Sequence, residues 1–413
     1  MTPFGLTFLV VLGLATVLQL WLGVRHMTYV QRHRNAVPPQ FTNEVTLEAH
    51  SRAADYTAAR TRLRLVGIVI DTALVLWLTF GGGLQWLYDL AAARTGSGLL
   101  REVLFVGLLA MLVTAVEIPQ SFYRTFVIEQ RFGFNKTTPA LFALDLAKGV
   151  LLGICLGLPL LAAILWLMQE VGSLWWLYAW LVMVAFTLFV TFIGPTVIAP
   201  LFNKFSPLDN PEIRERVSRL LDRCGFKVKA LMVMDGSRRS AHGNAYFTGF
   251  GKTKRIVFFD TLLARLTPTE VEAVLAHELG HFRLKHIVKR LALGILLTLV
   301  FFYLLNYFMD REWFYTGLGV TTQSTATALV LFYLVVPVFT FLLQPLSAMY
   351  SRKHEFEADR YAAQNASAGD LVSALVKLYK DNASTLTPDP VHSAFYDSHP
   401  PALIRIARLQ QAT

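Results

Sequence analysis

Seven runs of apolar residues limit how this chain can fold, because each can cross the roughly 30 Å hydrocarbon layer of a bilayer as a helix. The runs lie near residues 4–24, 65–88, 103–123, 147–168, 173–197, 287–308 and 326–349. Hydrophobic residues make up 54% of the 413-residue chain and charged residues 16%, a balance that a soluble protein of this length does not show. The sequence therefore predicts a mainly α-helical membrane protein with seven transmembrane helices.

The distribution of lysine and arginine predicts the orientation of the chain, because basic residues that flank a span are retained on the cytoplasmic side. Basic residues are frequent in 25–62 and 199–286 and rare around 89–101 and 309–325. With seven spans, this pattern places the N-terminus outside and places 199–286 and 350–413 together on the cytoplasmic face.

These signals divide the chain into four segments. They are a transmembrane region of five spans at 1–198, a cytoplasmic segment at 199–286, two further spans at 287–349 and a C-terminal cytoplasmic segment at 350–413. The first apolar run lacks the basic start and the small-residue cleavage site of a signal peptide. We therefore expect it to be retained as a span.

The charges and cysteines narrow the partners and the compartment. The formal net charge is +10, and its cations lie in loops beside the spans rather than in one stripe. This arrangement favours anionic membrane lipid over nucleic acid as the partner. Cys155 falls inside a span and Cys224 in the cytoplasmic segment, so we expect no disulfide and a reducing compartment.

Residues 277–281 read His-Glu-Leu-Gly-His and predict a metal site in the cytoplasmic segment. Two imidazoles four residues apart on a helix share one face, so His277 and His281 supply half of a tetrahedral zinc site. The carboxylate of Glu278 can take a proton from zinc-bound water, an arrangement typical of metallopeptidases. Residues 267–270, Thr-Pro-Thr-Glu, read as the capped start of the helix that carries the motif.

One further protein ligand must complete the site, and Glu355 is the best candidate. Asp359 lies four residues later, so both carboxylates share one face of a predicted helix. There Asp359 can accept a hydrogen bond from a liganding histidine. The alternative is that 351–360 is only a charged, solvated helix after a membrane exit. His286 and His354 are weaker candidates as ligands because each lies beside cations.

With these residues assembled, the chain resembles the type I CAAX prenyl proteases, which are integral-membrane zinc metalloproteases that also process the yeast a-factor precursor. The resemblance covers most of the chain. It rests on the two motifs above and on residues 129–135, 198–205, 240–250, 254–260 and 398–401.

The resemblance implies a fold in which seven long helices form a barrel around a water-filled chamber, with one zinc ion at its cytoplasmic end. Such a chamber would explain four charged residues within or at the ends of spans, where a lipid-facing charge is costly. They are Asp71, Glu117, Asp145 and Lys148. The alternative is that some of them, Asp145 and Lys148 above all, mark misplaced span ends.

The resemblance also implies roles for individual residues. Glu355 becomes the third zinc ligand and Asp359 its helper, while His399 and Arg405 match positions that face the scissile carbonyl. Asn244 matches a substrate-binding position. Residues 244–250 and 255–260 read as a small β-hairpin turning at 251–253, whose first strand can accept an extended peptide as an added strand.

The predicted function is therefore zinc-dependent cleavage of peptide bonds, with Glu278 as proton acceptor and then donor. By resemblance, the substrate is a CAAX-type peptide or protein, possibly prenylated. In a bacterial chain we expect membrane-protein quality control as the task, with prenylated peptides cut only when offered. The preference for Arg over Lys and the tail 410–413 favour a bacterial inner membrane; in a eukaryote the endoplasmic reticulum is expected. Alternatives are a heat-shock or site-two membrane protease, and a chamber-forming transporter or structural membrane protein with a non-catalytic zinc.

Overall fold

Long helices form most of the structure, a computed structural model that describes residues 2–249 and 254–411. Within these residues, six helical segments are long and apolar enough to cross a membrane. They are Pro3–Arg32 (α1), Leu99–Glu129, Pro139–Glu170, Gly172–Phe202, His286–Phe308 (α12) and Thr325–Asn365. A bent pair, α2 (Leu47–Leu78) and α3 (Gly83–Arg94), makes a seventh when counted as one span, which agrees with the seven predicted helices.

The predicted span 65–88 is not a single straight helix, because α2 and α3 meet at an angle of 59°. Three consecutive glycines cause the break. Gly82 has a φ of +77°, a left-handed conformation that most side chains avoid. Added Cβ atoms at Gly81 and Gly83 would lie 2.7 and 2.8 Å from atoms of Trp77. The chain therefore turns tightly over that tryptophan.

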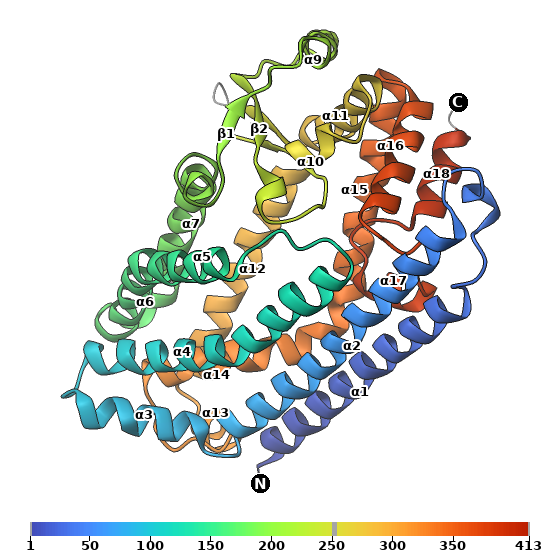
Figure 1. The fold of residues 1–413 in the computed structure, drawn as a ribbon. Coiled ribbons are helices and arrows are strands. Elements are labelled where there is room, and N and C mark those ends of the chain that lie inside the picture. The colour runs from blue at the N-terminus through green and yellow to red at the C-terminus, as the bar shows by residue number, and fades with distance from the viewer. Residues whose placement is uncertain (1, 250–253, 412–413) are drawn as a thin grey trace.

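Several spans are interrupted by wider π-helical turns or by proline. The segment 99–129 consists of α4 (Leu99–Tyr123) and η2 (Arg124–Glu129), and the segment 325–365 of α14 (Thr325–Thr340), η8 (Phe341–Leu343) and α15 (Gln344–Asn365). The segments 139–170 and 172–202 are built from α5 (Pro139–Leu152), η3 (Gly153–Gly157), α6 (Leu158–Glu170), η4 (Gly172–Leu174), α7 (Trp175–Ile193), η5 (Gly194–Ile198) and α8 (Ala199–Phe202). Figure 1 shows the long helices arranged as a ring.

A polar cavity of about 870 Å³ lies between α1, α2 and α4. Asp71 and Glu117 line it, as expected for chamber-facing charges. Asp145 and Lys148 do not line it. They lie inside α5, where Asp145 pairs with Arg239 at 2.7 Å and Lys148 donates to the carbonyl oxygen of Leu201 at 2.7 Å. These two residues therefore contact the segments that follow the fifth predicted span.

A small mixed sheet lies at one end of the ring (Figure 1). Its described strands have the order β1-β2-β4-β3 and comprise β1 (Phe205–Pro207), β2 (Ala230–Met234), β3 (Ala245–Thr248) and β4 (Arg255–Phe259). The antiparallel pairing of β3 with β4 confirms the predicted hairpin. Of the predicted turn, residues 251–253 lie outside the described part. Among the described strands β3 is an edge strand, so one side of it is unpaired.

Helices α9 (Pro211–Arg223) and α11 (Pro268–Arg283) share one apolar core with the sheet. The short α10 (Asp260–Leu263) leads from the sheet into α11, and α13 (Glu312–Thr316) follows α12. The C-terminal helices are α16 (Ala368–Asp381), α17 (Pro390–Tyr396) and α18 (Ala402–Gln410). They pack around α15, which brings residues near the end of the chain to α11.

Candidate metal centre

The helix that carries the histidine pair begins as the sequence predicts. The Thr267 hydroxyl accepts from the N–H of Glu270 at 3.4 Å, and the Thr267 N–H donates to the Glu270 carboxylate at 2.7 Å. Glu270 also accepts from Ser373 at 2.6 Å and pairs with Lys377 at 2.7 Å, both on α16. Glu270 is only 3% exposed, so this carboxylate both caps α11 and ties it to the C-terminal helices.

A glycine sets the close approach of α11 to α15. A Cβ atom at Gly280 would lie 2.9 Å from the Cα of Ala358, closer than side chains tolerate. Only glycine at this position allows the two helices to pack so tightly. The third predicted ligand lies three residues before Ala358, so this contact brings it level with the histidine pair.

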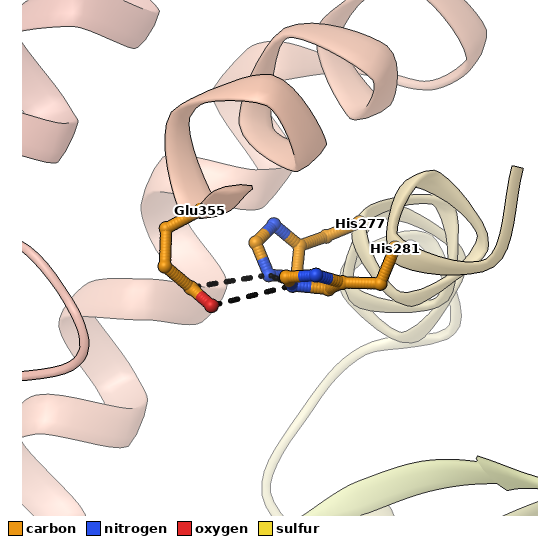
Figure 2. A group of neighbouring side chains, drawn as sticks. All are labelled: His277, His281 and Glu355. Carbon is orange, nitrogen blue, oxygen red and sulfur yellow. Dashed lines mark hydrogen bonds and ion pairs between the residues drawn. The ribbon is translucent and has the colours of Figure 1, made fainter. Parts of the chain in front are cut away.

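Figure 2 shows His277 and His281 pointing from α11 toward Glu355 on α15. The Nε2 atoms of the two histidines are 3.2 Å apart, and each lies 3.5 or 3.3 Å from an oxygen of Glu355. All three residues are buried. A tetrahedral ion with bonds of about 2.0–2.1 Å to nitrogen separates its ligands by about 3.3 Å, so the three donor atoms fit an ion such as zinc.

Asp359 contacts the other ring nitrogen of His277. With Nε2 facing the ligand cluster, the Nδ1–H of His277 donates to Asp359 at 2.9 Å. Burial lowers the pKa of His277, but its hydrogen bonds to Asp359 and Glu355 outweigh burial and raise the pKa to about 9. The hydrogen bond to Asp359 thus fixes the ring of His277 with Nε2 toward the cluster.

Arg405 on α18 holds Asp359 in turn. Its Nε and Nη2 atoms donate to the two oxygens of Asp359 at 2.9 and 2.5 Å, a bidentate pair. Its Nη1 lies 3.8 Å from Glu355, and the residue is 6% exposed. Arg405 therefore contacts both carboxylates that α15 presents to the histidine pair.

The other predicted site residues surround this cluster to different degrees. The Nδ1 of His399 lies 2.7 Å from Glu355, and the side chain of His399 is 63% exposed. Glu278 follows His277 on α11 and is half-buried. Asn244 lies just before β3, where its side-chain oxygen accepts from the N–H of Ala245 at 2.8 Å. Among the described contacts, none joins Asn244 to the cluster.

Sequence reasoning missed a chain of contacts from the cluster through His286 to Glu357. His286, predicted as a weak candidate ligand, contacts His281 through Nδ1 at 3.0 Å, and Glu357 contacts His286 at 2.9 Å. The five-residue spacing from His281 to His286 gave no signal, because residues i and i+5 do not share one face of a helix.

A helix-borne histidine pair, a carboxylate ligand from a second helix and an adjacent glutamate, set in a multi-span protein, define a membrane-embedded metallopeptidase. Residues 26–204 match the N-terminal region of CAAX prenyl proteases, which has five membrane helices, and residues 207–413 match peptidase family M48. The chain belongs to peptidase family M48, in its CAAX prenyl protease branch. This membership disfavours the transporter and structural alternatives.

Individual relatives resemble the chain along nearly all of its length. It is 34% identical to CAAX prenyl protease 1 homolog of Arabidopsis thaliana, with 98% of this chain and 97% of that protein covered. It is 32% identical to CAAX prenyl protease 1 of Saccharomyces cerevisiae, with 93% and 91% covered. The crystal structure of S. mikatae Ste24p superposes with a TM-score of 0.91 at 29% identity and covers 99% of both chains.

Proposed function

We propose that the chain is a zinc-dependent endopeptidase that cleaves near the C-terminus of prenylated CAAX-type peptides and that also takes part in membrane-protein quality control. The buried cluster of His277, His281 and Glu355 at ligand spacing is the observation that carries the proposal. The names of the relatives supply the substrate class.

His277, His281 and Glu355 would hold the zinc ion through two imidazole nitrogens and one carboxylate oxygen. Zinc supplies Lewis-acid polarisation of the scissile carbonyl and acidifies the attacking water to a pKa of about 7. Glu278, next to His277 on the same helix, accepts the proton of that water. It then returns the proton to the nitrogen of the leaving amine.

Two further residues support the developing charge. His399 is exposed and lies beside Glu355, so its imidazole can donate to the oxyanion from the open side of the cluster. Arg405 would add a positive charge beside the oxyanion through Nη1, which lies 3.8 Å from Glu355. Its Nε and Nη2 atoms pair with Asp359. In this proposal Asp359 fixes the ring of His277, and Arg405 keeps Asp359 in place.

The peptide would bind along the free edge of β3, starting at Asn244, as an added strand. Backbone hydrogen bonds then hold an extended substrate in register without demanding a particular side-chain sequence. The polar cavity lined by Asp71 and Glu117 offers about 870 Å³ within the ring for further parts of the substrate. A lipid-modified substrate stays close to the bilayer in this arrangement.

The membrane placement follows from the basic segments 25–62 and 199–286, which support a cytoplasmic position of the metal centre. We infer the inner membrane of a bacterium, or the endoplasmic reticulum in a eukaryotic cell. Fusing a reporter that is active only in the cytoplasm after residue 411 tests this orientation. A reporter that is active only on the opposite side contradicts it.

Cleavage of a farnesylated CAAX peptide and of its unmodified counterpart by the purified full-length protein in detergent tests the substrate class. We expect the farnesylated peptide to be cut with the higher kcat/KM, and a zinc chelator to abolish cleavage of both. Equal kcat/KM values contradict a preference for prenylated substrates. Cleavage that survives complete removal of metal contradicts the proposed chemistry.

A further inference from the structure

His286 reaches the metal centre because the chain reverses direction between α11 and α12. Lys285 adopts a left-handed conformation with φ of +57°, which is rare for a residue with a side chain. The reversal returns His286, the first residue of α12, onto His281. The Nδ1 atoms of the two rings are 3.0 Å apart, and His286 is fully buried.

The proton positions along this contact follow from the ligand role of His281. With Nε2 of His281 in the ligand cluster, its Nδ1 carries the hydrogen and donates to Nδ1 of His286. His286 then accepts at Nδ1, so its own proton is on Nε2. That nitrogen lies 2.9 Å from Oε2 of Glu357 and donates to the carboxylate. One tautomer assignment satisfies both hydrogen bonds.

His354 fixes the ring of His286 from the side. The two imidazoles stack with centroids 3.9 Å apart and planes inclined by only 10°. His354 precedes Glu355 on α15, so the stack connects His286 to the same helix that supplies the carboxylate ligand. His286 is fully buried, an environment that favours a neutral ring over a charged one.

We propose that His286 and Glu357 are positioning residues of the metal centre, which orient His281 and increase its basicity through a His281–His286–Glu357 hydrogen-bond relay. The inference rests on the proposed function because it requires a metal on His281. Each histidine ligand then has a carboxylate behind it. Asp359 contacts His277 directly, and Glu357 acts on His281 through an intervening imidazole. Carboxylates that orient a liganding histidine increase the affinity for the metal.

A second metal ion is the competing explanation, because His286, His354 and Glu357 also offer three ligand atoms close together. Coordination at Nε2 of His286 would remove the proton that this nitrogen donates to Glu357. With Nδ1 already accepting from His281, the ring would have to become an imidazolate. The relay avoids that cost, and the two explanations differ in the number of ions bound.

The test is the zinc affinity of purified full-length variants in detergent, measured by competition with a chromogenic chelator and combined with metal analysis. The side chain of Glu357 is partly exposed (32%), so we expect Glu357→Ala to fold, and its melting temperature in detergent checks this. His286→Gln tests the middle of the relay. Glu272→Ala is the matched control, because Glu272 lies on α11 but pairs with Arg223 at 3.1 Å, away from the cluster.

We expect one zinc per chain, and an affinity that falls roughly 10- to 100-fold in Glu357→Ala and in His286→Gln. The zinc affinity of Glu357→Gln, which keeps a hydrogen-bond acceptor but loses the negative charge, should fall less. The zinc affinity of Glu272→Ala should equal that of the wild type. An unaltered affinity in Glu357→Ala overturns the relay, and so do two ions in the wild type with one in Glu357→Ala. A wild type that binds no zinc overturns the proposed function itself.

Discussion

Arg405 and Asp359 form a buried bidentate pair whose two nitrogen–oxygen distances are 2.9 and 2.5 Å. They are 46 residues apart in sequence and belong to α18 and α15. Both side chains are largely excluded from solvent, so water weakens their attraction little. Because Asp359 also accepts from His277, the last helix of the chain acts on the metal centre through this carboxylate.

We expect Arg405→Ala to destabilise the protein by about 3 kcal/mol, because it leaves a buried carboxylate without its guanidinium partner. Arg405→Lys keeps the positive charge but loses the bidentate geometry of the guanidinium, so it should destabilise the protein less than Arg405→Ala. Thermal unfolding in detergent measures both. Arg408→Ala, on the same helix with its guanidinium over the Phe356 ring, is the control for general effects of losing an arginine. Equal melting temperatures for Arg405→Ala and wild type contradict the role of the pair.

Glu278→Gln tests the proton transfer separately from metal binding. Glutamine keeps the size of the side chain but cannot accept the proton of the attacking water. Peptidase activity should fall by roughly 100-fold or more, while zinc content stays that of the wild type. Activity assays and metal analysis on the same preparation separate the two effects. A fully active variant excludes Glu278 as the proton acceptor.

Much of the metal centre could be predicted because local spacing determines it. The four-residue intervals between His277 and His281 and between Glu355 and Asp359 place each pair on one helix face, and the structure brings the two faces together. Local spacing could not reveal that Arg405 holds Asp359, since that pairing depends on how the C-terminal helices pack.

Two details depend on features that local patterns do not carry. The run 65–88 predicts one span, and the structure bends that span at Gly82. Spacing alone also assigns His286 no contact with His281. Its contact with His281 depends on the left-handed conformation of Lys285, and nothing in the identity of a lysine predicts that conformation.

Glu270 gives a pH dependence of stability. Burial raises its pKa, but hydrogen bonds from Lys377, Ser373 and the Thr267 N–H outweigh burial, so its pKa lies below the ordinary 4.5. A carboxylate with a lowered native pKa stabilises the fold above its unfolded pKa and loses that contribution as pH falls through the native value. Glu270→Gln should therefore lower stability by about 2 kcal/mol at pH 7.

The difference between wild type and Glu270→Gln should shrink as the pH falls below about 4.5, because the native carboxylate then takes up its proton. Denaturant titrations at pH 7 and at steps below pH 4.5 measure it. Glu215→Gln, whose exposed side chain pairs with Arg219 one turn away, is the control and should show almost no difference at either pH. A constant gap across this range contradicts the linkage.

The phase of β3 allows peptide binding at the sheet edge to be tested with one proline. The N–H of Phe259 donates to the carbonyl of Asn244 at 2.9 Å, so alternate residues of β3 point their backbone groups toward β4. By this alternation the N–H of Phe247 points to the free edge. Phe247→Pro therefore removes a donor for an added strand but no hydrogen bond to β4.

Because the ring of Phe247 also packs in the core, Phe247→Ala is the matched control. We expect kcat/KM to be about tenfold lower in the proline variant than in the alanine variant, with equal zinc content in both. One hydrogen bond between neutral groups contributes about 1 kcal/mol, and the loss of strand register adds to this effect. Equal kcat/KM values in the two variants would mean that substrate does not pair with this edge.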